Sequence, residues 1–135
     1  MPDRSRPLVA LAALVVVASG LLVATRAQGP LADPLGDALY AALVYCLVVL
    51  VVPRTGAVRA AAVAAGLCAV IELAQLTGVP ADVVRHLPAA RFVVGTTFVP
   101  VDLVAYVTGA VLAALADVGI RRGAAREARR AVEPD

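Results

Sequence analysis

Residues 58–77, "VRAAAVAAGLCAVIELAQLT", decide the fold, because they form an almost unbroken apolar run. A helix that spans a membrane needs about 20 mostly apolar residues, which is the length of this run. Near its end, however, the run contains Glu72 and Gln75. An ionisable side chain is costly to bury inside a bilayer, so Glu72 must serve the packing or the function of the protein.

The rest of the chain shares this apolar character. Of its 135 residues, 61% are hydrophobic and 16% are charged, whereas a soluble domain is typically about half apolar and about a quarter charged. The sequence therefore predicts an integral membrane protein, with residues 1–135 forming one membrane domain. Cys46 and Cys68 lie within apolar runs and His86 stands alone, so we predict no disulfide, no metal site and no cofactor.

Four apolar runs are long enough to cross a membrane. They predict an all-α fold, an integral membrane four-helix bundle. The first run has a second interpretation as a cleaved signal peptide, because arginines precede its apolar core, but the length of that core favours a retained helix. The predicted helices span about 8–25, 34–52, 58–77 and 101–120.

The arginines are concentrated on one side of the predicted bundle. They lie at the amino end, in the loop between the second and third helices, and in the tail, residues 121–135. Because basic residues favour the cytoplasmic side, we predict that both termini are cytoplasmic. The basic cytoplasmic tail is predicted to anchor the last helix, and binding of anionic membrane lipids would add about 1 kcal/mol per basic residue. No nucleic-acid partner is predicted.

Residues 78–100 connect the third and fourth predicted helices. Within them "PADVVRHLPAARF", residues 80–92, predicts a short helix on the membrane surface, begun by Pro80 and ended by Pro88. The following "VVGTTFVP", residues 93–100, is too apolar for an exposed loop. We therefore expect a short interfacial or re-entrant segment that dips back toward the bundle, where protein can cover its backbone.

Three carboxylates are expected to meet near the outer end of the bundle. Asp37 and Asp102 lie in the first turns of the second and fourth helices, where the helix dipole stabilises an anion by about 0.3–1 kcal/mol. Glu72 lies near the C-terminal end of its helix, where the dipole disfavours an anion. Its distance from that end, about 7–8 Å at the helical rise per residue, matches the depth of the two aspartates.

Other polar residues complete a predicted pocket in the outer leaflet. Each of the three acids is followed, about one helical turn later, by a tyrosine or a glutamine on the same helix face. Arg26, Arg85 and Arg91 lie on the same side and are available as counter-ions. No residue is predicted to be catalytic. The predicted ligand-binding residues are Asp37, Tyr40, Glu72, Gln75, Arg85, Asp102 and Tyr106.

Small residues at helical spacing continue from Glu72 and from Asp102 along their helices. Residues of this kind let membrane helices pack closely. We therefore expect both acids to point toward the interior of the bundle rather than toward lipid. The two stripes consist of Ala61, Ala65 and Cys68 in the third helix and of Ala105, Gly109, Ala113 and Ala116 in the fourth.

Four segments carry a resemblance to a known family: "GDALYAALVY" at 36–45, "AVIELAQL" at 69–76, the segment around Arg85, and "VGTTFVPVDLVAYVTG" at 94–109. They resemble a family of small bacterial membrane proteins of unknown function, some members of which carry a ribosome-maturation label. The chain is also similar in layout to the VanZ-like proteins, in which an early Asp and Tyr, an E-x-x-Q and a later Asp and Gly recur on successive spans. The matching positions are Asp37, Tyr40, Glu72, Gln75, Asp102 and Gly109. The resemblance implies a multi-pass protein of the bacterial cytoplasmic (inner) membrane with a role in the cell envelope.

These observations predict a cell-envelope accessory or binding protein, whose pocket takes the headgroup of an envelope lipid or a cell-wall precursor. A second interpretation is a structural polar network that only locks the helices together, with function exerted through a partner protein. Paired carboxylates can also serve as general acid and base, and an intramembrane glutamate can carry protons. A small intramembrane enzyme and a proton-coupled transporter are therefore further alternatives. No oligomeric state is predicted.

Overall fold

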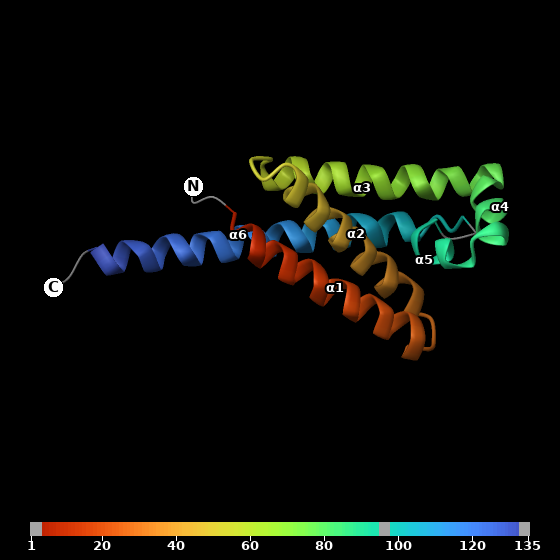
Figure 1. The fold of residues 1–135 in the computed structure, drawn as a ribbon, viewed down its shortest axis with the longest axis horizontal. Coiled ribbons are helices and arrows are strands. Elements are labelled where there is room, and N and C mark those ends of the chain that lie inside the picture. Colours follow the sequence, from red (N-terminus) through yellow and green to blue (C-terminus); the bar gives the residue numbers. More distant parts are fainter. Residues whose placement is uncertain (1–3, 95–97, 133–135) are drawn as a thin grey trace.

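The computed structural model describes residues 4–94 and 98–132. Within these ranges the regular structure is entirely helical, with no strand. Figure 1 shows long helices packed side by side, with the short helices α4 and α5 together at one end. The predicted all-α fold is confirmed.

Four of the helices form a bundle. Each of them is long and apolar enough to cross a membrane, and the chain is therefore a membrane protein. Apart from the end of the last helix, their bounds lie within a few residues of the predicted spans, which is the usual uncertainty at helix ends. The four helices are α1 (Arg6–Arg26), α2 (Ala32–Val51), α3 (Ala57–Ala74) and α6 (Asp102–Val132).

The last helix is longer than predicted. The prediction ended it at residue 120, but α6 continues to Val132. Arg121 and Arg122 end the apolar part of α6 without ending the helix, because arginine, alanine and glutamate are good helix formers. The basic tail is therefore a helical extension as far as Val132, and it reaches beyond the ends of the other helices (Figure 1).

Between α3 and α6 the chain folds into short helical turns at one end of the bundle, which we call the α4 end. A 3₁₀ turn (Gln75–Thr77) extends α3, and Gly78, with φ of 75°, then turns the chain in the left-handed conformation that favours glycine. The expected surface helix is α4 (Val79–His86). A second 3₁₀ turn (Pro88–Ala90) and α5 (Arg91–Val94) follow it.

The expected return of residues 93–100 to the bundle falls partly on residues 95–97, which lie outside the described residues. The described end of this segment does contact the bundle, because the backbone N–H of Val99 donates a hydrogen bond to Glu72 of α3. This contact places the start of α6 directly against the end of α3.

The central helix of the bundle is α2. It packs against α1, α3 and α6, and α3 also packs against α6. Where α2 meets α6, a Cβ added at Gly109 would lie 2.0 Å from the backbone oxygen of Ala38, so the two helix backbones are in direct contact. The two small-residue stripes thus face inward, although Ala116 at the far end of one stripe is exposed. Their buried members are Ala61, Cys68, Ala105 and Gly109.

Long apolar side chains lie on the outside of the bundle. Leu14 is 67% exposed, Val51 is 77% exposed and Val58 is 82% exposed. A soluble protein places most such side chains inside, and apolar surface of this extent marks an interaction with another apolar phase. The arrangement therefore suits a protein whose outer surface contacts lipid chains while alanines fill its interior.

Candidate functional site

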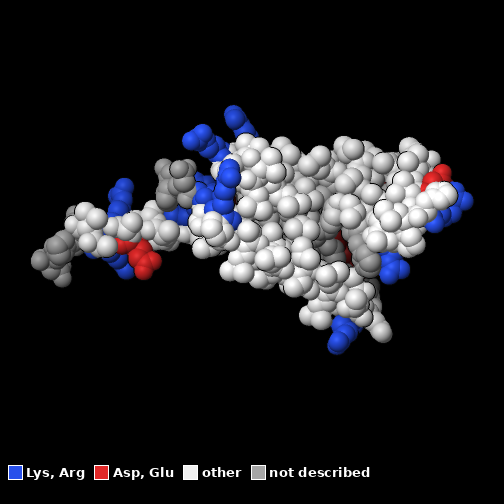
Figure 2. All heavy atoms as spheres, in the orientation of Figure 1, with Lys and Arg blue, Asp and Glu red and all other residues white. Residues whose placement is uncertain are grey.

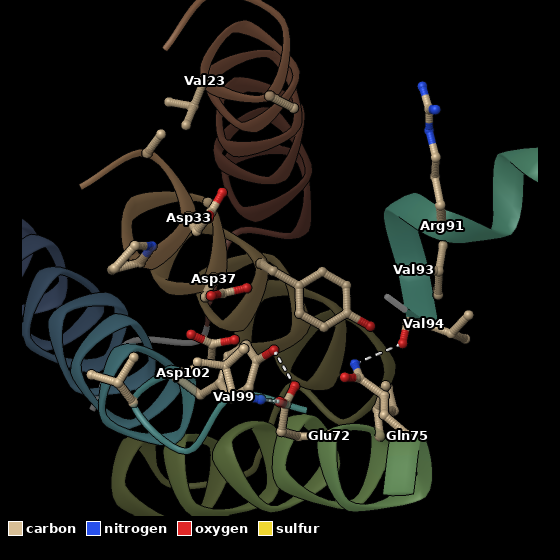
Figure 3. A pocket seen from close by; sticks show the side chains of 18 of the residues that line it. Val23, Asp33, Asp37, Glu72, Gln75, Arg91, Val93, Val94, Val99 and Asp102 are labelled. Carbon is tan, nitrogen blue, oxygen red and sulfur yellow. Dashed lines mark hydrogen bonds between the residues drawn. The ribbon is translucent and has the colours of Figure 1, made fainter. Parts of the chain in front are cut away.

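A cavity of about 610 Å³ lies at the α4 end of the bundle. Its walls come from α2, α3, α5 and α6, together with the end of α1 and the turn that follows it (Figure 3). In the space-filling view, acidic atoms are visible at the bottom of a recess in an otherwise uncharged part of the surface (Figure 2). The acidic residues that line the cavity are Asp33, Asp37, Glu72 and Asp102.

Glu72 is only 1% exposed, and both of its carboxylate oxygens accept hydrogen bonds. Oε1 accepts from the backbone N–H of Val99 at 2.7 Å, and Oε2 accepts from the hydroxyl of Tyr106 at 3.1 Å. Hydrogen bonds to an ionised acceptor are stronger than those between neutral groups. These two bonds join α3 to α6 and explain how a glutamate can lie inside an apolar helix.

The two aspartates approach Glu72 from the neighbouring helices. Asp37 lies in the second turn of α2, and Asp102 is the first residue of α6. Their carboxylates face each other (Figure 3), and Asp37 also interacts electrostatically with Glu72. Because α2 and α6 both begin at this end, their dipoles stabilise negative charge here. The structure thus brings the three carboxylates to one cavity; that they bind a ligand stays a prediction.

Tyr40, Tyr106 and Gln75 also line the cavity, as their spacing predicts. The two tyrosine rings pack edge to face, with centroids 6.4 Å apart and planes at 63°. Gln75 Nε2 donates to the carbonyl oxygen of Val94 at 2.9 Å, which holds α5 against the end of α3. Gln75 Oε1 is buried and has no hydrogen-bond partner in the described part of the chain. Buried polar atoms are nearly always bonded, so this oxygen departs from the usual pattern.

Arg85, the remaining residue of the predicted site, does not line the cavity. It lies exposed on α4 and forms an ion pair with Asp82, one turn earlier on the same helix. The arginine that lines the cavity is Arg91, at the start of α5, and its side chain points away from the carboxylates (Figure 3). Sequence spacing could not distinguish the two arginines, because the choice depends on how α4 and α5 fold back on the bundle.

A second group of polar side chains lies at the opposite end of the bundle. This tail-end cluster consists of Arg4, Tyr45 and Asp117. The Arg4 guanidinium donates to the Asp117 carboxylate at 2.7–3.2 Å and also to the carbonyl oxygens of Pro53 and Thr55. The Tyr45 hydroxyl donates to Asp117 at 2.8 Å. The hydrogen bonds that Arg4 donates to Asp117 raise the pKa of the Arg4 guanidinium above its ordinary value. The cluster ties the amino end of the chain to α2, α6 and the turn after α2.

The tail-end cluster is not predicted from the sequence, in which the arginines of the amino end indicate only orientation and Asp117 has no assigned role. A signal was present, since Asp117 interrupts the apolar stretch "VLAALADVGI", residues 111–120, and such a residue needs a partner. The partner could not be identified from spacing, because Arg4 lies 113 residues away along the chain.

The groups that line the cavity are mainly hydrogen-bond acceptors. Carboxylates accept only, and tyrosine hydroxyls can accept. Among residues 4–94 and 98–132, no group of three or more His, Cys, Asp and Glu side chains is arranged to hold a metal ion. Negative charge combined with acceptors favours a ligand that carries positive charge or several N–H or O–H donors.

The part of the chain that forms most of the cavity matches a known protein family. Residues 26–110 match the family described as "Protein of unknown function (DUF2809)". This range exceeds half of the chain and includes the four carboxylates of the cavity. No curated protein and no solved structure matches the chain. The likeness to VanZ-like proteins and the ribosome-maturation label stay predictions. The predicted membership of an uncharacterised family is confirmed: the chain belongs to the DUF2809 family.

Proposed function

We propose that this protein is an accessory protein of the bacterial cell envelope that binds the polar headgroup of an envelope lipid or cell-wall precursor. The observation that carries the proposal is the buried carboxylate of Glu72 in the wall of a cavity of about 610 Å³. Ligand sites are usually concave, about 300–1,000 Å³ in volume, with a few placed polar groups. An ionisable residue among membrane-spanning helices is a strong indication of function.

The orientation of the cavity is part of the proposal. Most arginines lie at the tail end of the bundle and along the extension of α6 (Figure 2). Since basic residues favour the cytoplasmic side, this end faces the cytoplasm, with both termini, and the cavity lies in the outer leaflet of the cytoplasmic membrane. A membrane-impermeant thiol reagent applied to intact cells should label Ala89→Cys and spare Ala128→Cys. The reverse pattern would overturn the orientation.

The layer between the two polar ends favours binding at one end over passage through the bundle. Ala41, Ala64 and Ala110 are fully or almost fully buried there, at 0%, 0% and 1% exposure. Their methyl groups provide no hydrogen-bonding site for an ion or a proton carrier. The charged groups of the cavity and those of the tail-end cluster are therefore separated by apolar packing, which supports a binding site more than a transport path.

Complementation of a deletion strain tests the proposal. We expect Asp102→Asn and Glu72→Gln to restore growth in the presence of envelope-directed antibiotics less well than the wild-type gene. Asp82→Asn, on the exposed surface of α4, is the matched control and should complement fully. If the cavity variants protect as well as the wild type while the deletion strain stays sensitive, the cavity is not the functional site.

A structural role through a partner protein is the second candidate. It is supported by the hydrogen bonds of Glu72, which occupy both carboxylate oxygens and join α3 to α6. The two candidate functions predict different effects of substituting Asp102, which is only partly buried. A binding site predicts that Asp102→Asn unfolds at the wild-type temperature in detergent yet fails to function. A structural network predicts that loss of function follows loss of stability.

A further inference from the structure

We propose that the ligand of the cavity is a membrane lipid whose headgroup carries a primary ammonium, with the ammonium in the cavity and an acyl chain in a groove between α1 and α2. This inference rests on the proposed function and specifies its ligand. Three features of the described residues carry it: a groove adjacent to the cavity, open space at a glycine of that groove, and the chemistry of the cavity wall.

The groove has a volume of about 320 Å³ and lies between the second half of α1 and the first half of α2. Apart from Asp37 and Tyr40, its lining is formed by glycine and aliphatic side chains. Four residues line both the groove and the cavity, so the two spaces are adjacent. An aliphatic groove beside a polar chamber matches the two parts of an amphiphile. The shared residues are Ala24, Gly36, Asp37 and Tyr40.

The groove lies beside a helix that faces lipid. Most of α1 is exposed in this bundle: Leu14 is 67% exposed and Leu21, in the groove wall, is 50% exposed. A Cβ added at Gly20 would meet no heavy atom within 4 Å, so this glycine faces open space. Lipid chains surround α1 in a membrane, and an acyl chain can enter the groove sideways while its headgroup stays at the polar end.

The cavity wall selects the headgroup. Four carboxylates line it, and the arginine among its described residues, Arg91, points away from them (Figure 3). A protonated amine compensates buried negative charge. It also brings three N–H donors for the carboxylates and tyrosine hydroxyls of the cavity wall. A quaternary ammonium has no N–H, and an anionic headgroup without an amine would meet like charges.

The test measures lipid binding to the purified full-length protein by native mass spectrometry in detergent. Phosphatidylethanolamine is compared with phosphatidylcholine and phosphatidylglycerol of the same acyl chains. We expect phosphatidylethanolamine to bind roughly tenfold or more tightly than either of the others, because an unpaired buried charge is strongly unfavourable. Equal binding of the three lipids, or a preference for phosphatidylglycerol, would overturn the assignment of the ammonium.

Two variants separate the groove from the cavity. Gly20→Leu fills the groove without touching the cavity lining, and it replaces a helix-interior glycine with a better helix former. We expect it to weaken phosphatidylethanolamine binding roughly tenfold, through loss of chain burial, and to leave binding of the chain-free analogue glycerophosphoethanolamine unchanged. Asp102→Asn should weaken both. The matched control is Gly66→Leu, since Gly66 also faces open space but lies on α3 outside the groove and the cavity.

The outcomes distinguish the inference from the function on which it rests. If Gly20→Leu binds phosphatidylethanolamine as the wild type does, the groove does not hold the acyl chain. If the wild type binds another headgroup and Asp102→Asn abolishes that binding, the proposed function stands and the ammonium assignment fails. If the wild type binds none of the three lipids, the inference fails, and the proposed function is decided separately by complementation with Asp102→Asn and Glu72→Gln.

Discussion

At the scale of single residues, Glu72 depends on helices other than its own. Near the C-terminal end of α3 the helix dipole disfavours its charge, and Asp37 adds repulsion. The compensating groups come from α6 and the residues just before it: the Val99 N–H and the Tyr106 hydroxyl. The carboxylate thus lies next to the N-terminal end of α6, where a dipole favours an anion. A position that is unfavourable in its own helix becomes favourable in the bundle.

Substitutions at Glu72 should separate charge from hydrogen bonding. Glu72→Gln keeps an acceptor for Val99 N–H, so we expect a loss of about 1 kcal/mol in the free energy of unfolding. Glu72→Ala leaves both donors without an acceptor and creates a void, so we expect a loss of about 2–5 kcal/mol. Unfolding in detergent, followed by circular dichroism, measures both. Asp82→Ala, at a 62% exposed side chain, is the control and should change stability by no more than about 0.5 kcal/mol. A stable Glu72→Ala variant would contradict this account.

At the scale of the helices, α6 connects the two polar ends of the molecule. It contributes Asp102 and Tyr106 to the cavity and Asp117 to the tail-end cluster. About 22 Å of helix separates the two aspartates at the usual rise per residue. Between them, the backbone of α6 is in direct contact with that of α2 at Gly109. This contact lies one turn from Tyr106 and opposite the residue after Asp37, so it contributes to the geometry of the cavity.

Gly109→Ala should disturb that contact. The added methyl group would lie 2.0 Å from the Ala38 backbone oxygen, so the helices must separate. We expect a loss of about 1–3 kcal/mol in stability, as for other overpacked interiors, together with weaker ligand binding. Gly66→Ala is the matched control: Gly66 is also inside a helix but has no atom within 4 Å of an added Cβ. It should be neutral or stabilise the protein by up to about 1 kcal/mol. Equal effects at the two glycines would show that helix propensity, and not packing, governs Gly109.

At the scale of the whole molecule, the sequence predicted what depends on local pattern. Hydropathy located the four spans, and matching depths brought Asp37, Glu72 and Asp102 to one end. The pairing of Arg4 with Asp117 could not be predicted, because it depends on how the amino end returns to the bundle. Likewise, the placement of Arg91 at the cavity follows from the fold of the short helices at the α4 end. Local periodicity contains no information about either arrangement.

The tail-end cluster makes a prediction about how the whole chain is held together. The side chain of Arg4 is buried, at 3% exposure, and that of Asp117 is mostly buried, at 14%, so removing Asp117 leaves the buried Arg4 guanidinium without its carboxylate partner. We expect Asp117→Ala to lower the free energy of unfolding by about 3–5 kcal/mol.

The double variant Arg4→Ala with Asp117→Ala should lose less than the sum of the two single losses, because the buried Arg4 guanidinium is removed together with the carboxylate that it binds. Unfolding in detergent measures the free energies of the wild type, the two single variants and the double variant. Protease cleavage after the first helix reports whether α1 leaves the bundle. Arg54→Ala, at an exposed arginine of the same end, is the control and should change little. Strictly additive losses would mean that Arg4 and Asp117 are not coupled, and that α1 is held only by its apolar contact with α2.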